Sequence, residues 1–128
     1  MDLTDRELKL KLRLAQIEKN EACRKDFLTF VKSMWPDFIT GRHHKIIADK
    51  FQRVASGELK RLIINMAPRH TKSEFASFLF PAWMMGNNPR MKIIQATHTT
   101  ELAVNFGRKT KNLIDTDEYK EVFPEVKL

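Results

Sequence analysis

The chain has 128 residues, a formal net charge of +7, and 42% hydrophobic residues. This length suffices for one domain with a single core. A basic balance favours an anionic partner, of which nucleic acid is the commonest, although a modest excess also serves solubility alone. The single cysteine, Cys23, excludes an internal disulfide and fits a reducing compartment.

No targeting or membrane-spanning segment is expected. The N-terminus is charged throughout, so it lacks the apolar region of a signal peptide. The longest apolar stretch, residues 75–85, is interrupted by Ser77 and Pro81 and is too short to span a bilayer. The sequence therefore predicts a soluble, intracellular protein.

The first helix is expected to begin after Thr4, which forms a capping box with Glu7. The leucines that follow, at every second position over residues 8–14, also fit a strand. Strong helix formers surround them, and this favours the helix.

Apolar residues at helical spacing predict four further helices. A second helix is expected over residues 21–34 and a third over residues 43–56, with Gly57 at its C-terminal end. A fourth begins near Lys72, and Thr99 caps a fifth.

Two strands are expected between these helices. Leu62, Ile63 and Ile64 form an apolar block of the kind found in buried parallel strands, and Pro68 ends it. Residues 91–97 are predicted as a second strand. Strand, helix and strand imply a right-handed crossover and a parallel pair. The predicted fold class is therefore α/β, an incomplete three-layer P-loop NTPase fold with parallel strands, preceded by an N-terminal helical region.

Lys72 and Ser73 lie between the first predicted strand and the helix that follows it, as in a phosphate-binding loop. The standard Walker A pattern has glycine at the positions of Met66 and Thr71, and this chain has neither. Taken alone, the pattern also fits an ordinary strand-to-helix connection with a solvated lysine.

The wider sequence resembles one family. Residues 66–74, Met-Ala-Pro-Arg-His-Thr-Lys-Ser-Glu, are similar to the variant P-loop of the large terminase subunits of tailed bacteriophages, which usually reads Pro-Pro-Arg-His-Gly-Lys-Ser. The likeness extends from Phe38 to the C-terminus, at residues 41–44, 57–61, 80–83, 86–89, 93–97, 101–103, 106–108 and 119–124.

The resemblance implies ATP and Mg²⁺ as cofactors. The loop that would bind nucleotide comprises Pro68, Arg69, His70, Thr71, Lys72 and Ser73. Lys72 would contact the β- and γ-phosphates, and the Ser73 hydroxyl would bind Mg²⁺. Arg69 would act in cis on the γ-phosphate. Thr71 departs from the family pattern. The family usually has glycine at this position, which lets the backbone pass close to the phosphates.

An adenine pocket is expected from aromatic and histidine side chains upstream of the loop, at the distance where related ATPases place it. The candidates are Trp35, Phe38, His43 and His44. Trp35 and Phe38 fit equally well as residues that close the core. Five basic residues are candidates for DNA phosphate contacts, although a solvated basic face is the default: Arg42, Lys45, Arg108, Lys109 and Lys111.

The chain lacks the strand-borne aspartate and following glutamate that a P-loop ATPase needs, and also the carboxylate cluster of a two-metal nuclease, which the family carries in a later domain. It is therefore expected to be a truncated N-terminal part of a terminase large subunit. Residues 1–57 would form N-terminal helices, and residues 58–128 the first half of the ATPase core, inactive alone.

The predicted function is ATP binding in a motor that packages double-stranded DNA into a viral capsid. The resemblance implies a portal protein, a small terminase subunit and further copies of the chain as partners. It places the protein in the host-cell cytoplasm and transiently at the procapsid portal. Two alternatives remain: a non-catalytic basic module that binds DNA or a partner, and a fragment of a helicase-like P-loop ATPase.

Overall fold

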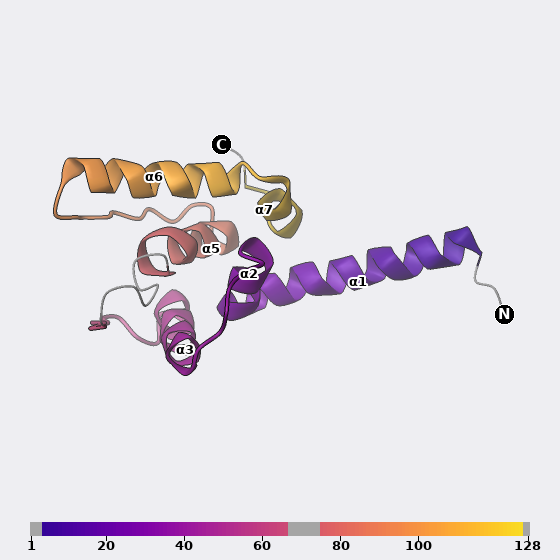
Figure 1. The fold of residues 1–128 in the computed structure, drawn as a ribbon, viewed down its shortest axis with the longest axis horizontal. Helices are drawn as coiled ribbons and strands as arrows, with labels where there is room; N and C mark the ends of the chain where they lie inside the picture. Colours follow the sequence, from indigo (N-terminus) through magenta and orange to yellow (C-terminus); the bar gives the residue numbers. More distant parts are fainter. Residues whose placement is uncertain (1–3, 67–74, 127–128) are drawn as a thin grey trace.

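The computed structural model describes residues 4–66 and 75–126, and every regular element within them is a helix. In chain order the elements are α1 (Asp5–Lys25), α2 (Phe27–Met34), α3 (Arg42–Ser56), the π-helical turn η1 (Phe75–Leu79), α5 (Phe80–Asn87), α6 (Thr100–Ile114) and α7 (Asp117–Val122) (Figure 1). Within this part of the chain, no helix has both the length and the continuous apolar surface needed to cross a membrane.

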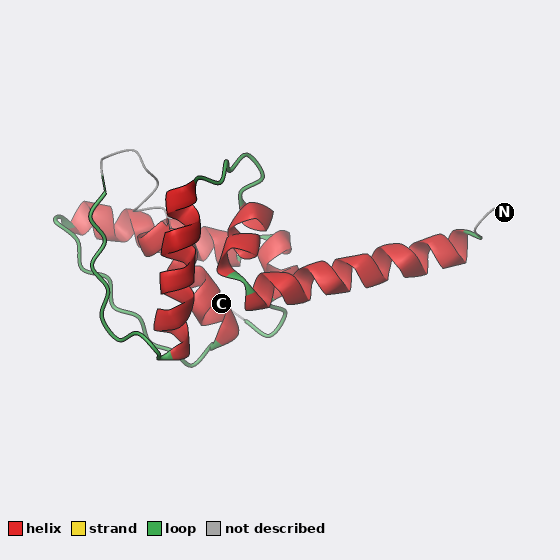
Figure 2. Ribbon diagram, turned by 90° about the horizontal axis from the view of Figure 1, so that it is seen from below, coloured by secondary structure: helices red, strands yellow, loops and turns green. Residues whose placement is uncertain are grey.

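The predicted α/β fold is wrong. Residues 4–66 and 75–126 contain no strand, so the three-layer P-loop NTPase fold with its parallel strands is not formed (Figure 2). The segments 62–66 and 91–97, predicted as strands, are not helical, but no backbone hydrogen bond joins them. A strand is stabilised by the hydrogen-bond ladder to its neighbour, and an alternating apolar pattern does not supply that neighbour.

Helix α1 confirms the helical interpretation of the N-terminal leucines. The Thr4 hydroxyl oxygen caps it by accepting a hydrogen bond from the Glu7 amide at 3.3 Å. The first half of α1 extends away from the other helices in both views (Figures 1 and 2). Its apolar side chains are therefore exposed, with exposed fractions of 60% for Leu10 and 63% for Leu12.

The predicted helix over residues 21–34 is divided at Asp26. The backbone of Asp26 is extended, and its carboxylate accepts hydrogen bonds from the Thr29 amide at 3.2 Å and from the Thr29 hydroxyl at 2.6 Å. Aspartate is a strong N-cap because its short side chain satisfies free amides of the first turn. The chain therefore turns between α1 and α2, and α2 packs across the end of α1.

The third and fifth predicted helices are confirmed with their caps. Gly57 ends α3 with φ of 84°, a left-handed conformation that glycine adopts without strain. Thr99 begins α6 by accepting a hydrogen bond from the Leu102 amide at 3.2 Å. Thr116 caps α7 in the same way, with the Tyr119 amide as donor at 3.3 Å.

The helical segment after residue 74 changes from the π-turn η1 to α5 at Phe80, one residue before Pro81. Pro81 has no amide hydrogen to donate to the carbonyl of Ser77. The side-chain amide of Gln95 donates to that carbonyl instead, at 2.7 Å. The Ser77 carbonyl, which Pro81 cannot use, therefore holds segment 91–97 against the helices through Gln95.

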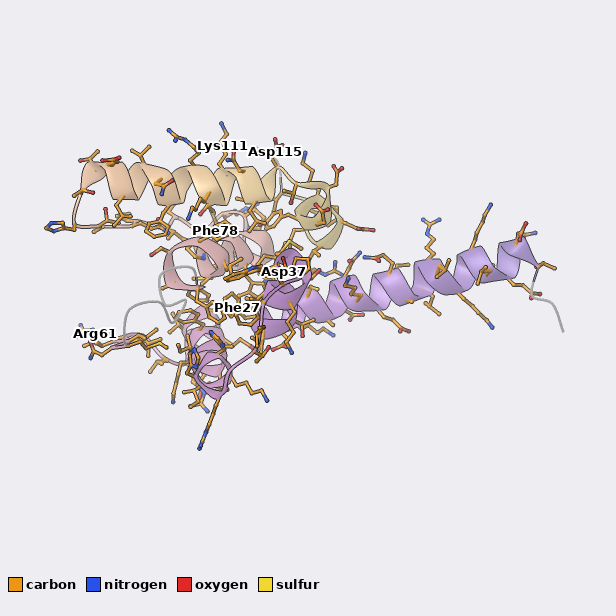
Figure 3. All side chains as sticks on the ribbon, viewed as in Figure 1. Phe27, Asp37, Arg61, Phe78, Lys111 and Asp115 are labelled. Atoms are coloured by element: carbon orange, nitrogen blue, oxygen red, sulfur yellow. The ribbon has the colours of Figure 1, made fainter. Side chains whose placement is uncertain are left out.

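The core forms around Phe27, the first residue of α2. Its ring makes edge contacts with Phe51, Phe75, Phe80 and Trp83, with centroid distances of 5.6 to 5.7 Å. Figure 3 shows Phe27 in the interior and Arg61 at the periphery. One cluster of buried side chains joins elements on both sides of residue 57. The domain boundary at that residue stays a prediction.

Two buried hydrogen bonds connect helices that are far apart in the chain. The Trp83 indole donates to the carbonyl of Cys23 at 2.9 Å, joining α5 to α1. The Tyr119 hydroxyl donates to the carbonyl of Ala82 at 2.7 Å, joining α7 to α5. A buried tryptophan or tyrosine removes a large apolar area from water, and its N–H or O–H group can also donate to a backbone carbonyl.

Candidate nucleotide site

The residues predicted to bind phosphate lie outside the described residues: Pro68, Arg69, His70, Thr71, Lys72 and Ser73. The structure describes the chain on both sides of them. The extended segment 60–66 precedes them, and the helical turn η1 begins at Phe75, two positions after Ser73. Phe75 is therefore the first described residue after the predicted phosphate-binding residues.

The predicted adenine-pocket residues come together around Phe75. The Phe38 ring lies 4.7 Å from His44 and 5.4 Å from Phe75, measured between ring centroids, and His44 lies 5.1 Å from Phe75. Trp35 joins the group through Phe38, at 5.3 Å. These contacts bring together the end of α2, the connection to α3, α3 itself and η1.

His44 has a structural role that the sequence interpretation missed. Its Nδ1 atom accepts a hydrogen bond from the Gly41 amide at 2.8 Å, which satisfies a free donor at the start of α3. The side chain is buried, with 6% of its surface exposed. A histidine three positions after a candidate N-cap glycine is the signal that could have predicted this contact.

Trp35, Phe38 and His43 are less buried than His44. Each is half-buried, and Trp35 and Phe38 pack against the core cluster. The His43 ring lies beside that of His44, with centroids 3.8 Å apart. The group therefore fills space between α2, α3 and η1 while keeping part of its aromatic surface accessible.

The described residues offer no acidic cage for a metal ion. Residues 4–66 and 75–126 contain no group of three or more histidine, cysteine, aspartate or glutamate side chains that could hold one. Mg²⁺ commonly keeps several waters and binds through substrate phosphates with few protein ligands.

Basic residues predicted to meet DNA lie on different helices. Arg42 and Lys45 are exposed at the start of α3, and Arg108 and Lys111 are exposed on α6. Lys109 is half-buried, with its ammonium 5.8 Å from the centre of the Phe106 ring. The five candidates therefore do not share one element.

A further basic group on the projecting half of α1 was missed. Its members are exposed and recur along residues 6–13: Arg6, Lys9, Lys11 and Arg13. The signal was present in the sequence as lysine and arginine alternating with leucine. It was interpreted only as a choice between helix and strand.

Comparisons of the chain with known protein families, with curated proteins and with solved structures find no match. The resemblance to terminase large subunits therefore remains a prediction.

Proposed function

We propose that the chain binds ATP with Mg²⁺ through residues 68–73 and serves in a terminase-type motor that packages double-stranded DNA. The proposal includes a portal protein, a small terminase subunit and further copies of the chain as partners. It also includes work in the host-cell cytoplasm and at the procapsid portal. Its sequence basis is the run Arg69-His-Thr-Lys-Ser73.

The observation that supports this proposal is the convergence of aromatic side chains on Phe75. Phe38 and His44 precede the loop by many positions in the chain, yet both pack against Phe75, which follows Ser73 by two positions, and Trp35 packs against Phe38. A nucleotide needs an aromatic surface for its base and cationic or amide donors for its phosphates. The aromatic surface is present around Phe75, and Arg69 and Lys72 precede Phe75 closely in the sequence.

Each loop residue has a distinct role in the proposal. Lys72 precedes a helical segment, where a cation is unfavourable unless an anion binds beside it. The phosphates of ATP supply that anion, and amides at the start of a helix can donate to the same oxygens. Arg69 would contact the γ-phosphate, and Ser73 would bind Mg²⁺ through its hydroxyl.

The test is a titration of the 128-residue chain with a non-hydrolysable ATP analogue and Mg²⁺. Trp35 is one of two tryptophans and is half-buried, so its fluorescence is expected to respond to a stacked base. Lys72→Ala should weaken binding by about tenfold or more, because a charge-assisted hydrogen bond contributes roughly 1.5–3 kcal/mol. Thr71→Gly should tighten binding.

Lys92→Ala is the matched control, since Lys92 is exposed on the segment 91–97. It should bind the analogue as the unmodified chain does. If Lys72→Ala also binds as tightly as the unmodified chain, the loop is not a phosphate site and the proposal is wrong.

A second candidate function, DNA binding without nucleotide, is favoured by α1. The first half of this helix projects from the other helices (Figures 1 and 2). Its exposed residues include Arg6, Lys9, Lys11 and Arg13. Cationic side chains on an exposed helix can neutralise DNA phosphates and release counterions. Such binding is independent of sequence and weakens with added salt.

The test compares two triple variants that remove equal charge. Lys9, Lys11 and Arg13 are changed to glutamine in one, and Arg42, Lys45 and Lys111 in the other. On a fixed DNA duplex, log affinity falls with log salt, and the α1 triple should reduce the steepness of that fall by roughly 2 to 3. The second triple should lower it less. Equal losses, or affinity that does not change with salt, would refute a role of α1 in DNA binding.

A further inference from the structure

The connection between α2 and α3, residues 35–41, is held at both ends by hydrogen bonds. At its start the Phe38 amide donates to the Trp35 carbonyl at 3.0 Å. At its end the Gly41 amide donates to Nδ1 of His44 at 2.8 Å, and the His44 amide donates back to the Gly41 carbonyl at 3.2 Å. Because this second pair is reciprocal, His44 fixes the place where the connection enters α3.

His44 also supports aromatic rings that are more accessible than its own. Its ring lies 4.7 Å from that of Phe38 and 5.1 Å from that of Phe75, measured between centroids. Only 6% of the His44 surface is exposed, whereas Trp35 and Phe38 are half-buried. His44 therefore offers little surface to a ligand, and the rings beside it offer more.

The contact between Gly41 and the histidine rings is tightly packed. A Cβ atom on Gly41 would lie 2.8 Å from Cε1 of His43 and 3.3 Å from Nδ1 of His44. A side chain at this position would push these rings away from the backbone, so the close approach favours glycine. The hydrogen bond from the Gly41 amide to His44 is therefore supported by the packing around it.

We infer that His44 is a positioning residue of the proposed nucleotide site, an inference that rests on the proposed function. Its Nδ1 atom holds the Gly41 amide and its ring packs against Phe38, so Trp35 and Phe38 stay where they can meet a base. Aromatic faces stack on any base, and one stacked base strengthens binding by roughly fivefold or more. Trp35 and Phe38 make this contact, and His44 acts through them.

Two substitutions of His44 separate its hydrogen bond from its ring. His44→Phe keeps an aromatic ring and removes the acceptor, so the Gly41 amide loses this partner. His44→Gln removes the ring and keeps an acceptor, because glutamine at the third helical position can accept from the N-cap amide. Both variants are titrated with the ATP analogue and Mg²⁺, and with tripolyphosphate, which has no base.

The two ligands distinguish positioning from a general loss of structure. His44→Phe should weaken binding of the analogue by roughly fivefold or more, while tripolyphosphate still binds as before. His44→Gln should retain most of the affinity for the analogue. In the ligand-free chain, acrylamide quenching of Trp35 should rise in His44→Phe alone. The other tryptophan, Trp83, is 5% exposed and should contribute little to that quenching.

His98→Phe is the matched control, because His98 is exposed and lies outside the connection. It should bind both ligands as the unmodified chain does. The inference is wrong if His44→Gln loses as much affinity as His44→Phe, or if His44→Phe binds the analogue normally or loses both ligands equally. Should His44→Phe fail to fold, a loss of analogue binding in His44→Gln would still overturn it. An unmodified chain that binds neither ligand would instead refute the proposed function, and the inference with it.

Discussion

The aromatic core around Phe27 and the extended segments 60–66 and 91–97 are both apolar in sequence, yet their side chains differ in burial. Phe27 is fully buried, whereas Ile63 and Ile94 are 86% and 95% exposed. Hydrophobicity does not separate these residues, since isoleucine is among the residues most often found inside proteins. The difference lies in the backbone that carries them.

A helix satisfies its own backbone hydrogen bonds, so it can be packed against other helices on any apolar face. The helices that carry Phe27, Phe51 and Trp83 meet in this way. An extended segment needs a neighbour for its backbone before both of its faces can be covered. Segments 60–66 and 91–97 have one covered face each, and the apolar residues on the other face stay in solvent.

The largest expected effect comes from removing the central ring of the core. Phe27→Ala deletes a ring that contacts four other aromatic rings, and buried Phe→Ala changes cost about 3–5 kcal/mol. Ile63→Ala, at an exposed apolar position, should change the free energy of unfolding by less than about 0.5 kcal/mol. Urea denaturation followed by circular dichroism measures both.

The comparison between core and exposed segments would fail if the two variants lost similar stability. Equal losses would mean that Ile63 is packed in solution. Measuring both variants at several protein concentrations shows whether association affects the result.

A smaller effect is expected from two glycines that lie in helices with different surroundings. A Cβ atom on Gly86 would lie 2.5 Å from the Phe123 ring, whereas a Cβ atom on Gly107 would meet nothing within 4 Å. Gly86→Ala should therefore destabilise by about 1–3 kcal/mol through overpacking. Gly107→Ala should stabilise by about 0.5–1 kcal/mol, because alanine loses less backbone entropy in a helix.

Thermal unfolding of both glycine variants checks this prediction. Opposite shifts in the midpoint are expected. A Gly86→Ala variant that gains stability like Gly107→Ala would show that α5 and Phe123 are not in close contact.

Local signals in the sequence predicted much of the helical structure. Thr4, Thr99 and Gly57 each act at a helix end through their own side chain or backbone, so a short window of sequence is sufficient. The division at Asp26 followed the same chemistry and could have been predicted from Asp26 and Thr29. The apolar stripe across residues 21–34 concealed it, since both helices contribute residues to the same core.

Short windows of sequence could not show that segments 62–66 and 91–97 do not form strands, because strand pairing depends on residues that are distant in the chain. The block Leu62–Ile64 was predicted to be a buried strand, but only Leu62 and Ile64 pack against the core, and Ile63 is 86% exposed. The site shows the same limit. The sequence grouped Trp35, Phe38 and His44, but the bond from the Gly41 amide to His44 and the contacts with Phe75 depend on the tertiary arrangement.

An effect similar in size to that of Gly86→Ala is expected at Tyr119, which links α7 to the core. Its hydroxyl donates to the Ala82 carbonyl at 2.7 Å, and the side chain is fully buried. Tyr119→Phe leaves that carbonyl without this donor, which should cost about 1–3 kcal/mol at neutral pH. The exposed Ser56 hydroxyl, which donates to the Arg53 carbonyl, is a control site, and Ser56→Ala should have almost no effect.

The same residue predicts how stability changes in alkaline solution. Burial raises the pKa of Tyr119 well above its ordinary value of 10.0, because the charged form loses hydration in the core. The unfolded chain releases this proton near pH 10 and the folded chain keeps it. The contribution of Tyr119 is therefore fully present below that pH and is lost as pH rises from there toward the pKa of the folded state.

Comparison with Tyr119→Phe isolates this contribution, because lysine residues titrate in both proteins. The difference in unfolding free energy between the two should narrow above pH 10. Tyr119 is the only tyrosine in the chain, so tyrosinate absorbance reports its ionisation directly. An absorbance midpoint near pH 10 in the folded protein, with a constant difference in stability, would place Tyr119 in solvent and α7 away from the core.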